Sequence, residues 1–251
     1  MDREDYIYGI RAIIEAIDAG KEIDKIFIKK DLHGDLIAEL TERIRQLHIP
    51  TQRVPVERIN RITRKNHQGV LAMLSAVTYH RLDHLVPQLY EDGVLPFIVV
   101  LDGITDVRNF GAIARTCECA GVDAIVIPER GSVSVGGDAI KTSAGALHRV
   151  PVCRERSITN AVKFLRDNGY KVVAASEKVD INYTCEDYTT PVAIVMGAED
   201  TGISPDVLEQ CDTMVSIPML GHIGSLNVSV AAGVLMYEVV RQRLDANLEV
   251  I

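Results

Sequence analysis

The chain has 251 residues, 47% of them hydrophobic, and its 27 Lys and Arg against 35 Asp and Glu leave a net charge of −8. This length and composition predict a globular protein of one or two domains with a substantial core. No apolar run approaches the ~18 residues of a membrane span, so we expect no membrane partner. The acidic start, MDREDYIYG, lacks the features of a signal peptide, and the five scattered cysteines include no C-x-x-C pair. Both features favour a cytoplasmic protein with reduced thiols.

The charge is distributed unevenly, which weakens the argument that an acidic chain does not bind nucleic acid. Residues 1–80 hold 13 basic and 12 acidic residues, so the excess of acid lies in the remainder. Seven basic residues crowd into one part of this segment, opposed there by Glu42 and Glu57 alone: Arg43, Arg45, Arg53, Arg58, Arg61, Arg64 and Lys65. Two interpretations stay open, a solvated helical face and a patch that binds the phosphates of RNA.

Residues 1–78 predict a small α/β domain with its own core. Apolar spacing indicates helices around 10–17, 36–47 and 56–62, and strands at 25–29, 51–54 and 69–77. His67, at the entry of the last strand, is interpreted as a structural or surface histidine because no acid or thiol partner lies near it in sequence. Residues 79–95 contain Pro87 and Gly93, mixed charge and only a weak apolar stripe, and we interpret them as a linker.

Strands and helices alternate through the rest of the chain, which predicts a second domain at residues 96–251. Candidate strands are 97–101, 123–127, 170–176, 192–196 and 214–217, and candidate helices are 109–120, 138–146, 157–168, 204–211 and 225–243. Runs such as FIVVL and VAIVM are continuously apolar, as expected when helices cover both faces of a sheet. We therefore predict an α/β domain with an open, mostly parallel, doubly wound sheet. Ligands of such sheets bind at the carboxyl ends of the strands.

Polar side chains stand out in the loops that follow three of these strands. The first loop, DGITDVRNFG, carries Asn109, and Arg115 lies close to two helical turns further on, so the two side chains point in a similar direction. Asn109 is either a site residue or only a helix cap. Arg115 stands in an otherwise small and apolar helix, and its planar fork suits a phosphate or a carboxylate.

The second and third loops add a carboxylate and an uncharged segment. In GAEDTG, Glu199 directly follows a buried strand, where either a catalytic carboxylate or a surface acid fits. In IPMLGHIGSLN, Ser225 is predicted to cap the helix that follows. A neutral, Gly-rich loop suits a polar ligand held by backbone groups, and the alternative is a tightly packed helix start.

Several common motifs are missing from the sequence. It contains no G-x-G-x-x-G after a strand, no P-loop, no H-E-x-x-H and no G-x-S-x-G, and its seven histidines show no metal-ligand spacing. We therefore expect no metal. A standard dinucleotide fold, a P-loop NTPase, a zinc protease and a serine hydrolase all lose support.

Together, the three loops resemble the motifs of the SpoU family, also called TrmH, of RNA ribose methyltransferases in the SPOUT class. The matching segments are LDGITDVRNFGAIARTCECAG, IVMGAEDTGIS and IPMLGHIGSLNVSVAAGVLMYE, and the resemblance covers residues 97–243. YGIRAIIEAI and HQGVLA in residues 1–78 resemble the family's L30e-like RNA-binding domain. The arrangement is most similar to the RlmB branch, which methylates the ribose of a guanosine in large-subunit rRNA.

The resemblance implies a trefoil knot in the second domain and S-adenosylmethionine as the cofactor, with a pocket lined by Gly197, Ile217, Met219 and Leu226. It implies a catalytic set of Asn109, Arg115, Glu199, Ser225 and Asn227. The implied reaction is methyl transfer to the 2′-hydroxyl of a ribose, in a guanosine of 23S rRNA, by a homodimer for which the helix at 228–240 is a plausible interface. The departures from the family pattern are Val107-Arg108 before Asn109, and Ile223 in the last loop.

The resemblance leaves the role of Arg115 and the identity of the RNA open. The family mechanism often makes the first-loop arginine a general base, but a guanidinium has a pKa above ~12 and releases its proton poorly. We therefore interpret Arg115 as the group that orients and neutralises the target phosphate. Two alternatives are a tRNA 2′-O-ribose methyltransferase and a non-catalytic RNA-binding ribosome-assembly protein of the same fold.

Overall fold

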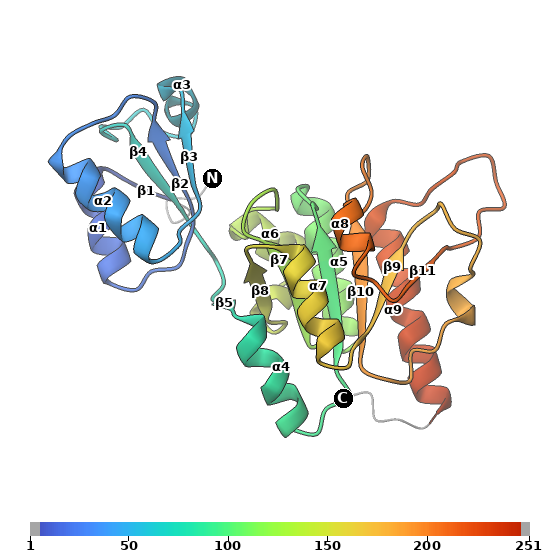
Figure 1. Cartoon of the computed structure of the whole chain (residues 1–251). Helices are drawn as coiled ribbons and strands as arrows, with labels where there is room; N and C mark the ends of the chain where they lie inside the picture. The colour runs from blue at the N-terminus through green and yellow to red at the C-terminus, as the bar shows by residue number, and fades with distance from the viewer. Residues whose placement is uncertain (1–5, 247–251) are drawn as a thin grey trace. The chain divides into compact units, whose positions relative to one another are not determined.

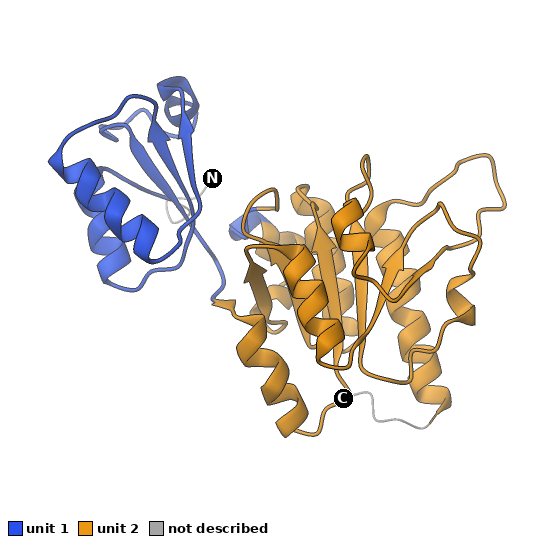
Figure 2. Ribbon diagram, viewed as in Figure 1, with its two compact units in different colours: residues 1–78, 134–138 blue, residues 79–133, 139–251 orange. Residues whose placement is uncertain are grey.

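The computed structural model of the chain describes residues 6–246 (Figure 1), and the chain divides into two compact units (Figure 2). The first unit comprises residues 1–78 together with 134–138, and the second comprises residues 79–133 and 139–251. No helix among residues 6–246 is both long enough and apolar enough to cross a membrane.

The first unit is a small sheet with helices on both faces. Among its described residues, four strands form the sheet in the order β1-β4-β2-β3, in which β4 is antiparallel to β1 and β2, and β3 is parallel to β2. The strands are β1 (Tyr6–Tyr8), β2 (Ile23–Lys29), β3 (Thr51–Val54) and β4 (Val70–Leu74). The helices are α1 (Ile10–Asp18), α2 (Asp35–Gln46) and α3 (Val56–Asn60).

Alternation along β2 and β4 determines which side chains face which helices. Ile26 of β2 lies in a core with Ile13 of α1 and Leu40 of α2. Phe27, one residue further on, points to the opposite face and packs with Ile59 of α3. The predicted helices and strands of this segment are present, and the short edge strand β1 is an addition that three residues were too few to indicate.

His67 is a structural residue, as its sequence context predicts. Its side chain is buried, its Nδ1 accepts the backbone N–H of Gly69 at 2.9 Å, and its Nε2 lies 2.9 Å from Oδ1 of Asn60. Because Nδ1 accepts, the proton of the neutral ring lies on Nε2 and is donated to Asn60.

Residues 79–95 are not a linker, and this expectation is corrected by the structure. They form strand β5 (Tyr79–His80) and helix α4 (Leu82–Glu91) of the second unit. Leu82 and Val86 are 2% and 0% exposed and belong to the core of that unit. The weak apolar stripe is therefore sufficient to anchor a helix, because a sheet is present for it to cover.

Within the described part of the second unit, seven strands form one sheet in the order β11-β9-β10-β6-β7-β8-β5, and every neighbouring pair is parallel. Beyond β5, the strands are β6 (Phe97–Asp102), β7 (Ala124–Pro128), β8 (Val152–Glu155), β9 (Lys171–Ala175), β10 (Val192–Gly197) and β11 (Thr213–Val215). The predicted open parallel sheet is confirmed. β8 was not predicted, since it contains only two apolar residues, Val152 and Cys153, before two charged ones.

Helices cover both faces of this sheet. The described helices of this unit are α4, α5 (Val107–Cys119), α7 (Ile158–Asp167), α8 (Pro205–Leu208) and α9 (Val228–Asp245), with 3-10 turns at Ala146–His148 and Tyr183–Cys185. Helix α6 (Gly137–Thr142) begins in the first unit and continues into this one. Side chains of α4, α7 and α8 share one core with the sheet. α5 and α9 pack against each other, and Figure 1 shows them on the side of the sheet opposite α7.

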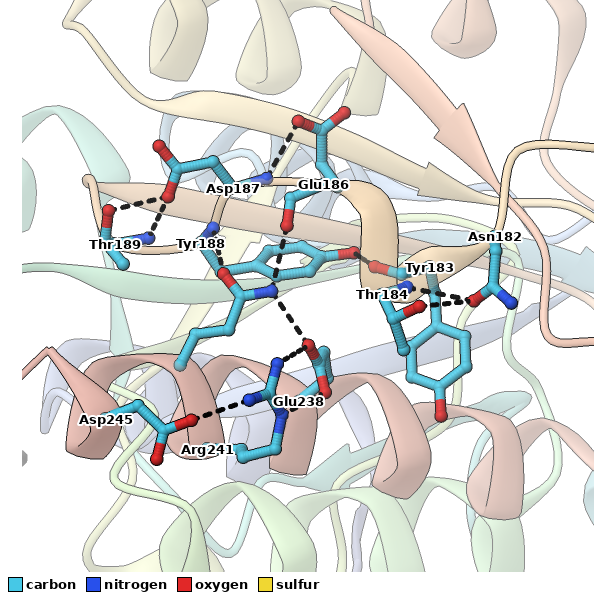
Figure 3. A network of polar contacts seen from close by, with 11 residues as sticks. Asn182, Tyr183, Thr184, Glu186, Asp187, Tyr188, Thr189, Glu238, Arg241 and Asp245 are labelled. Carbon is cyan, nitrogen blue, oxygen red and sulfur yellow. Dashed lines mark hydrogen bonds and ion pairs between the residues drawn. The ribbon is translucent and has the colours of Figure 1, made fainter.

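The carboxyl-terminal half of α9 is tied to the segment 182–189 by a polar network (Figure 3). The side chain of Gln242 accepts the N–H of Tyr188 at 3.0 Å and donates to the carbonyl of Glu186 at 2.9 Å. Arg243 is buried and donates to the carbonyl oxygens of Leu95 and Pro96 at 2.8 and 3.0 Å. These contacts hold the helix in place, so that its first residues stand in a defined position.

Candidate active site

Three loops that are distant in sequence meet through one side chain, Asn227. Its amide Nδ2 donates to Oδ1 of Asn109 at 3.0 Å and to Oε1 of Glu199 at 2.5 Å. Asn109 lies in the first turn of α5, which follows β6, Glu199 follows β10, and Asn227 directly precedes α9. β6 and β10 are neighbouring parallel strands, with Gly197 paired to Asp102 at their carboxyl ends. The structure therefore brings three of the five expected catalytic residues into one hydrogen-bonded group.

Asn109 is not the cap of α5, so its side chain is available for this contact. The cap is Asp106, whose carboxylate accepts the backbone N–H groups of Arg108 and Asn109 at 2.8 and 2.9 Å. The helix start is thereby satisfied without the amide of Asn109, and that amide is free to meet Asn227.

The cap of α9 is Asn227, not Ser225, which corrects the sequence-based prediction. Oδ1 of Asn227 accepts the N–H of Ser229 at 3.0 Å and its hydroxyl at 2.5 Å. The helix therefore begins at Val228, because an asparagine with a non-helical backbone satisfies its first turn. Ser225 and Leu226 are left in the loop, where both side chains are exposed.

A pocket of about 440 Å³ lies beside this group, at the carboxyl ends of the strands. Its volume falls within the ~300–1,000 Å³ of small-molecule sites. All four residues expected to hold a cofactor line it: Gly197, Ile217, Met219 and Leu226. Glu199, Ser225 and Asn227 line it as well, whereas Asn109 and Arg115 do not.

One wall of the pocket was missed from the sequence. Ser176, Glu177 and Lys178 follow β9 and line the pocket. The rule that pointed to the other loops, that ligands bind at the carboxyl ends of parallel strands, applies equally to this one. The polar run SEK after a buried strand was the available signal.

The loop after β10 folds back tightly on the strand, and Gly197 permits this. Ala198 and Gly202 exchange two backbone hydrogen bonds, at 3.1 and 2.8 Å. A Cβ atom on Gly197 would lie 2.2 Å from the carbonyl carbon of Gly202 and 2.3 Å from the nitrogen of Ile203. The position of Glu199 in this loop therefore depends on a glycine at the end of β10.

Arg115 lies outside the hydrogen-bonded group. Its side chain is exposed, and neither a hydrogen bond nor an ion pair joins it to any other residue in the described range 6–246. The sequence suggested a partner for this guanidinium, and the structure offers none within that range. Its charge is therefore available to an anion from outside the chain.

No cysteine is among the residues that line the pocket. Burial raises the pKa of the Cys153 and Cys211 thiols to about 12, so both remain protonated at neutral pH. The part of the chain that the structure describes contains no group of three or more His, Cys, Asp or Glu side chains arranged to hold a metal ion. The hydrogen-bonded group and Ser225 supply two amides, one carboxylate and a hydroxyl, and the pocket beside them adds Glu177, Asp200 and Lys178.

An open parallel sheet with a pocket and polar loops at the carboxyl ends of its strands is the arrangement in which α/β proteins bind small molecules. Two family models cover most of the chain: "SpoU rRNA Methylase family" matches residues 96–237, and "RNA 2'-O ribose methyltransferase substrate binding" matches residues 6–80. The chain therefore belongs to the SpoU family of RNA 2′-O-ribose methyltransferases, and the resemblance to the SpoU/TrmH family is confirmed.

Similar proteins agree with this assignment over nearly the whole length. A putative TrmH family tRNA/rRNA methyltransferase of Staphylococcus saprophyticus is 38% identical over 237 residues, which is 94% of this chain and 95% of that protein. A protein of the same description from Staphylococcus aureus is 36% identical over 239 residues, 95% and 96% of the two chains.

Solved structures show the same fold. The SpoU methyltransferase AviRb from Streptomyces viridochromogenes, in complex with AdoMet, matches with a TM-score of 0.60 and 24% identity over 96% of this chain and 90% of that one. The A. aeolicus TrmH/SpoU tRNA modifying enzyme matches with a TM-score of 0.55 and 29% identity over 66% and 86% of the two chains. The predicted SPOUT-type α/β fold is thereby confirmed.

Proposed function

We propose that this protein transfers the methyl group of S-adenosylmethionine to the 2′-hydroxyl of a guanosine ribose in 23S rRNA. The observation that carries the proposal is the Asn227 amide, which joins Asn109 and Glu199 beside the pocket. Membership of the SpoU family supports the class of reaction. The guanosine and the large-subunit rRNA follow from the motif resemblance to the RlmB branch.

The pocket fits this cofactor in size and charge. Its charged lining residues are three acids, Glu177, Glu199 and Asp200, against one base, Lys178. An acidic lining favours a ligand with a net positive charge, as a sulfonium nucleoside with an amino-acid group has. Gly197, Ile217, Met219 and Leu226 would supply apolar contacts and backbone hydrogen-bonding groups.

Bound there, the sulfonium supplies an already activated methyl group, so the task of the chain is chiefly to position the ribose. Asn227 uses both of its amide hydrogens, which fixes Asn109 and Glu199 relative to each other. Oε2 of Glu199 has no hydrogen-bond donor among residues 6–246, and with the Ser225 hydroxyl it orients the ribose hydroxyl in this proposal. Arg115 binds the adjacent phosphate.

The remaining expectations belong to the same proposal. The first domain, residues 1–78, binds RNA as an L30e-like module, and the second, residues 96–251, is catalytic and contains the trefoil knot. The protein works in the cytoplasm as a homodimer. On α9, Val230, Tyr237 and Leu244 recur every seven residues and are 51%, 51% and 59% exposed, which supports an interface along this helix.

Two measurements test the proposed function. Titration calorimetry of the full chain with S-adenosylmethionine is expected to show one site per chain, and no binding would favour the non-catalytic RNA-binding alternative. Mapping of ribose methylation across rRNA and tRNA in a deletion strain is expected to reveal one guanosine of 23S rRNA that has lost its 2′-O-methyl group. A loss confined to tRNA would instead identify the protein as a tRNA methyltransferase.

A further inference from the structure

We propose that one face of the first unit binds an unpaired stretch of RNA, through aromatic rings that receive bases and exposed cations that receive phosphates. This surface, called the α3 face here, consists of Tyr6, Tyr8, Arg58, Arg61, Arg64 and Lys65. The inference rests on the proposed function for RNA as the substrate. It adds which residues of the first unit contact the RNA and which form of RNA they select.

The structure divides six of the seven basic residues of the sequence cluster into two groups. On α2, Arg43 is paired with Asp18 at 3.0 Å and Glu39 at 2.8 Å, and Arg45 is paired with Glu42 at 2.8 Å. The four basic residues of the α3 face are exposed and form no ion pair with any residue between 6 and 246. The charge on α2 is thus neutralised locally, and the charge on the α3 face is not.

The two faces of the small sheet consequently differ in charge. The segment 55–68 holds four basic residues and one acid, Glu57. Helices α1 and α2, on the opposite face, hold three basic and five acidic residues between them. A local positive surface on an otherwise acidic chain is what attracts a polyanion to one side of a protein.

Aromatic side chains lie among these cations. The ring centroids of Tyr6 and Tyr8 on edge strand β1 are 6.3 Å apart, and both side chains are only half-buried. Nζ of Lys65 lies 5.6 Å from the Tyr8 ring centroid, and Cζ of Arg58 lies 5.1 Å from that of Phe27. A nucleotide presents a flat base and a phosphate, and this pairing of ring and cation matches both. In duplex RNA the bases are stacked inside the helix, so the rings favour an unpaired strand.

The segment 55–68, which carries these cations, is held in place by hydrogen bonds of His67 and Gln68. The buried ring of His67 joins Asn60 and Gly69, and Oε1 of Gln68 accepts the N–H of Ile10 at 3.2 Å. Gln68 takes a positive φ of 52°, which turns the chain back into β4. A segment ordered before binding loses less conformational entropy when RNA arrives.

A matched pair of variants of the full chain tests the proposal, because each removes two positive charges. Binding is measured by fluorescence anisotropy with a labelled 12-nucleotide unpaired RNA and with a blunt RNA duplex of the same strand. We expect the double variant Arg61→Gln/Arg64→Gln to bind the unpaired RNA about tenfold more weakly at 0.1 M salt, and its log affinity–log salt slope to be shallower by about 1.4. The control Arg43→Gln/Arg45→Gln is expected to stay within about twofold of wild type.

A third variant tests the aromatic part. Tyr8→Leu keeps apolar bulk but removes the ring. It is therefore expected to lower the affinity for the unpaired RNA by about fivefold or more and to leave the affinity for the duplex unchanged. Circular dichroism of each variant confirms folding. The inference would be overturned if the two double variants lowered RNA affinity equally, or if the wild-type protein bound the duplex more tightly than the unpaired RNA. Methyl transfer by the wild-type protein would then still support the proposed function. If the wild-type chain binds neither RNA and methylates none, the proposed function fails as well.

Discussion

The side-chain amide of Asn227 donates to Asn109 across 3.0 Å, although 118 residues separate the two in the chain. The same nitrogen reaches Glu199, while its Oδ1 caps α9 through Ser229. Both amide hydrogens and the Oδ1 atom of this side chain are therefore used inside the protein. One asparagine joins the starts of two helices and the loop after β10, and the predictions below begin with it.

Replacing Asn227 by Ser separates these two tasks. A serine still caps α9, so the free energy of unfolding is expected to stay within about 1 kcal/mol of wild type. It offers no amide to Asn109 and Glu199, and misplacement of these groups is expected to lower the methyl-transfer rate about 100-fold. Urea unfolding and single-turnover methylation measure the two effects. Wild-type turnover in this variant would remove Asn227 from the catalytic machinery.

Arg115→Lys tests whether the exposed guanidinium binds a phosphate. An ammonium keeps the charge but not the planar fork, so we expect turnover at saturating RNA to be retained and the KM for RNA to rise several-fold. Steady-state methylation kinetics measure both. Arg149→Lys is the control, since Arg149 is exposed but paired with Glu118 at 3.3 Å. Abolished turnover with unchanged RNA affinity would contradict the positioning role.

Two glycines that line the same pocket are expected to differ greatly in how far replacement by alanine destabilises the protein. At Gly197 the added Cβ meets backbone at 2.2 Å, and the loop after β10 cannot close, so we expect a loss of more than ~3 kcal/mol of unfolding free energy. At Gly224 no atom lies within 4 Å of such a Cβ, and a change below ~0.5 kcal/mol is expected. Thermal unfolding with and without S-adenosylmethionine measures the stability of the Gly197→Ala and Gly224→Ala variants. A stable Gly197→Ala protein would show that the loop can relax.

The pair between Glu238 and Arg241 on α9 makes stability depend on acid pH. The hydrogen bond from Arg241, at 2.7 Å, holds the pKa of the Glu238 carboxyl below its ordinary 4.5. The stabilisation is therefore complete above pH 4.5 and is lost as the pH falls through the lowered pKa. Glu238→Gln is expected to lower the free energy of unfolding by about 1 kcal/mol at pH 7, and to change it little at an acid pH below the lowered pKa of Glu238. Urea unfolding at both pH values measures this, and an equal difference at both would refute it.

The exposed apolar residues Val230, Tyr237 and Leu244, which form a stripe along α9, predict a dimer. Light scattering of the wild-type protein at micromolar concentration is expected to give twice the 27.6 kDa of one chain. Tyr237→Glu places a charge in the middle of the stripe and is expected to give monomers. Leu47→Glu, at a side chain 59% exposed in the first unit, is the control and should leave the dimer intact. A monomeric wild-type protein would count against the interface.

Local patterns in the sequence determined most of the secondary structure and the loops that matter. Continuous apolar runs such as FIVVL and VAIVM predict strands buried on both faces, because only a covered parallel sheet hides every side chain of such a run. Asn109 and Glu199 could be selected because they lie in the segments that follow these strands, Asn109 at the start of the next helix and Glu199 two residues beyond the strand. Their roles rested on the order and spacing of three motifs, which is also information carried along the chain.

Tertiary structure alone decided which of these residues act together. It made Asn227 the cap in place of Ser225, added Ser176 and its neighbours to the pocket, and left Arg115 outside the hydrogen-bonded group. It packed residues 79–95 into the second unit and neutralised Arg43 while leaving Arg61 unpaired among residues 6–246. Each of these outcomes depends on distances between residues far apart in sequence. Periodicity and propensity report only what neighbours along the chain prefer, and hydrogen bonds and ion pairs form between neighbours in space.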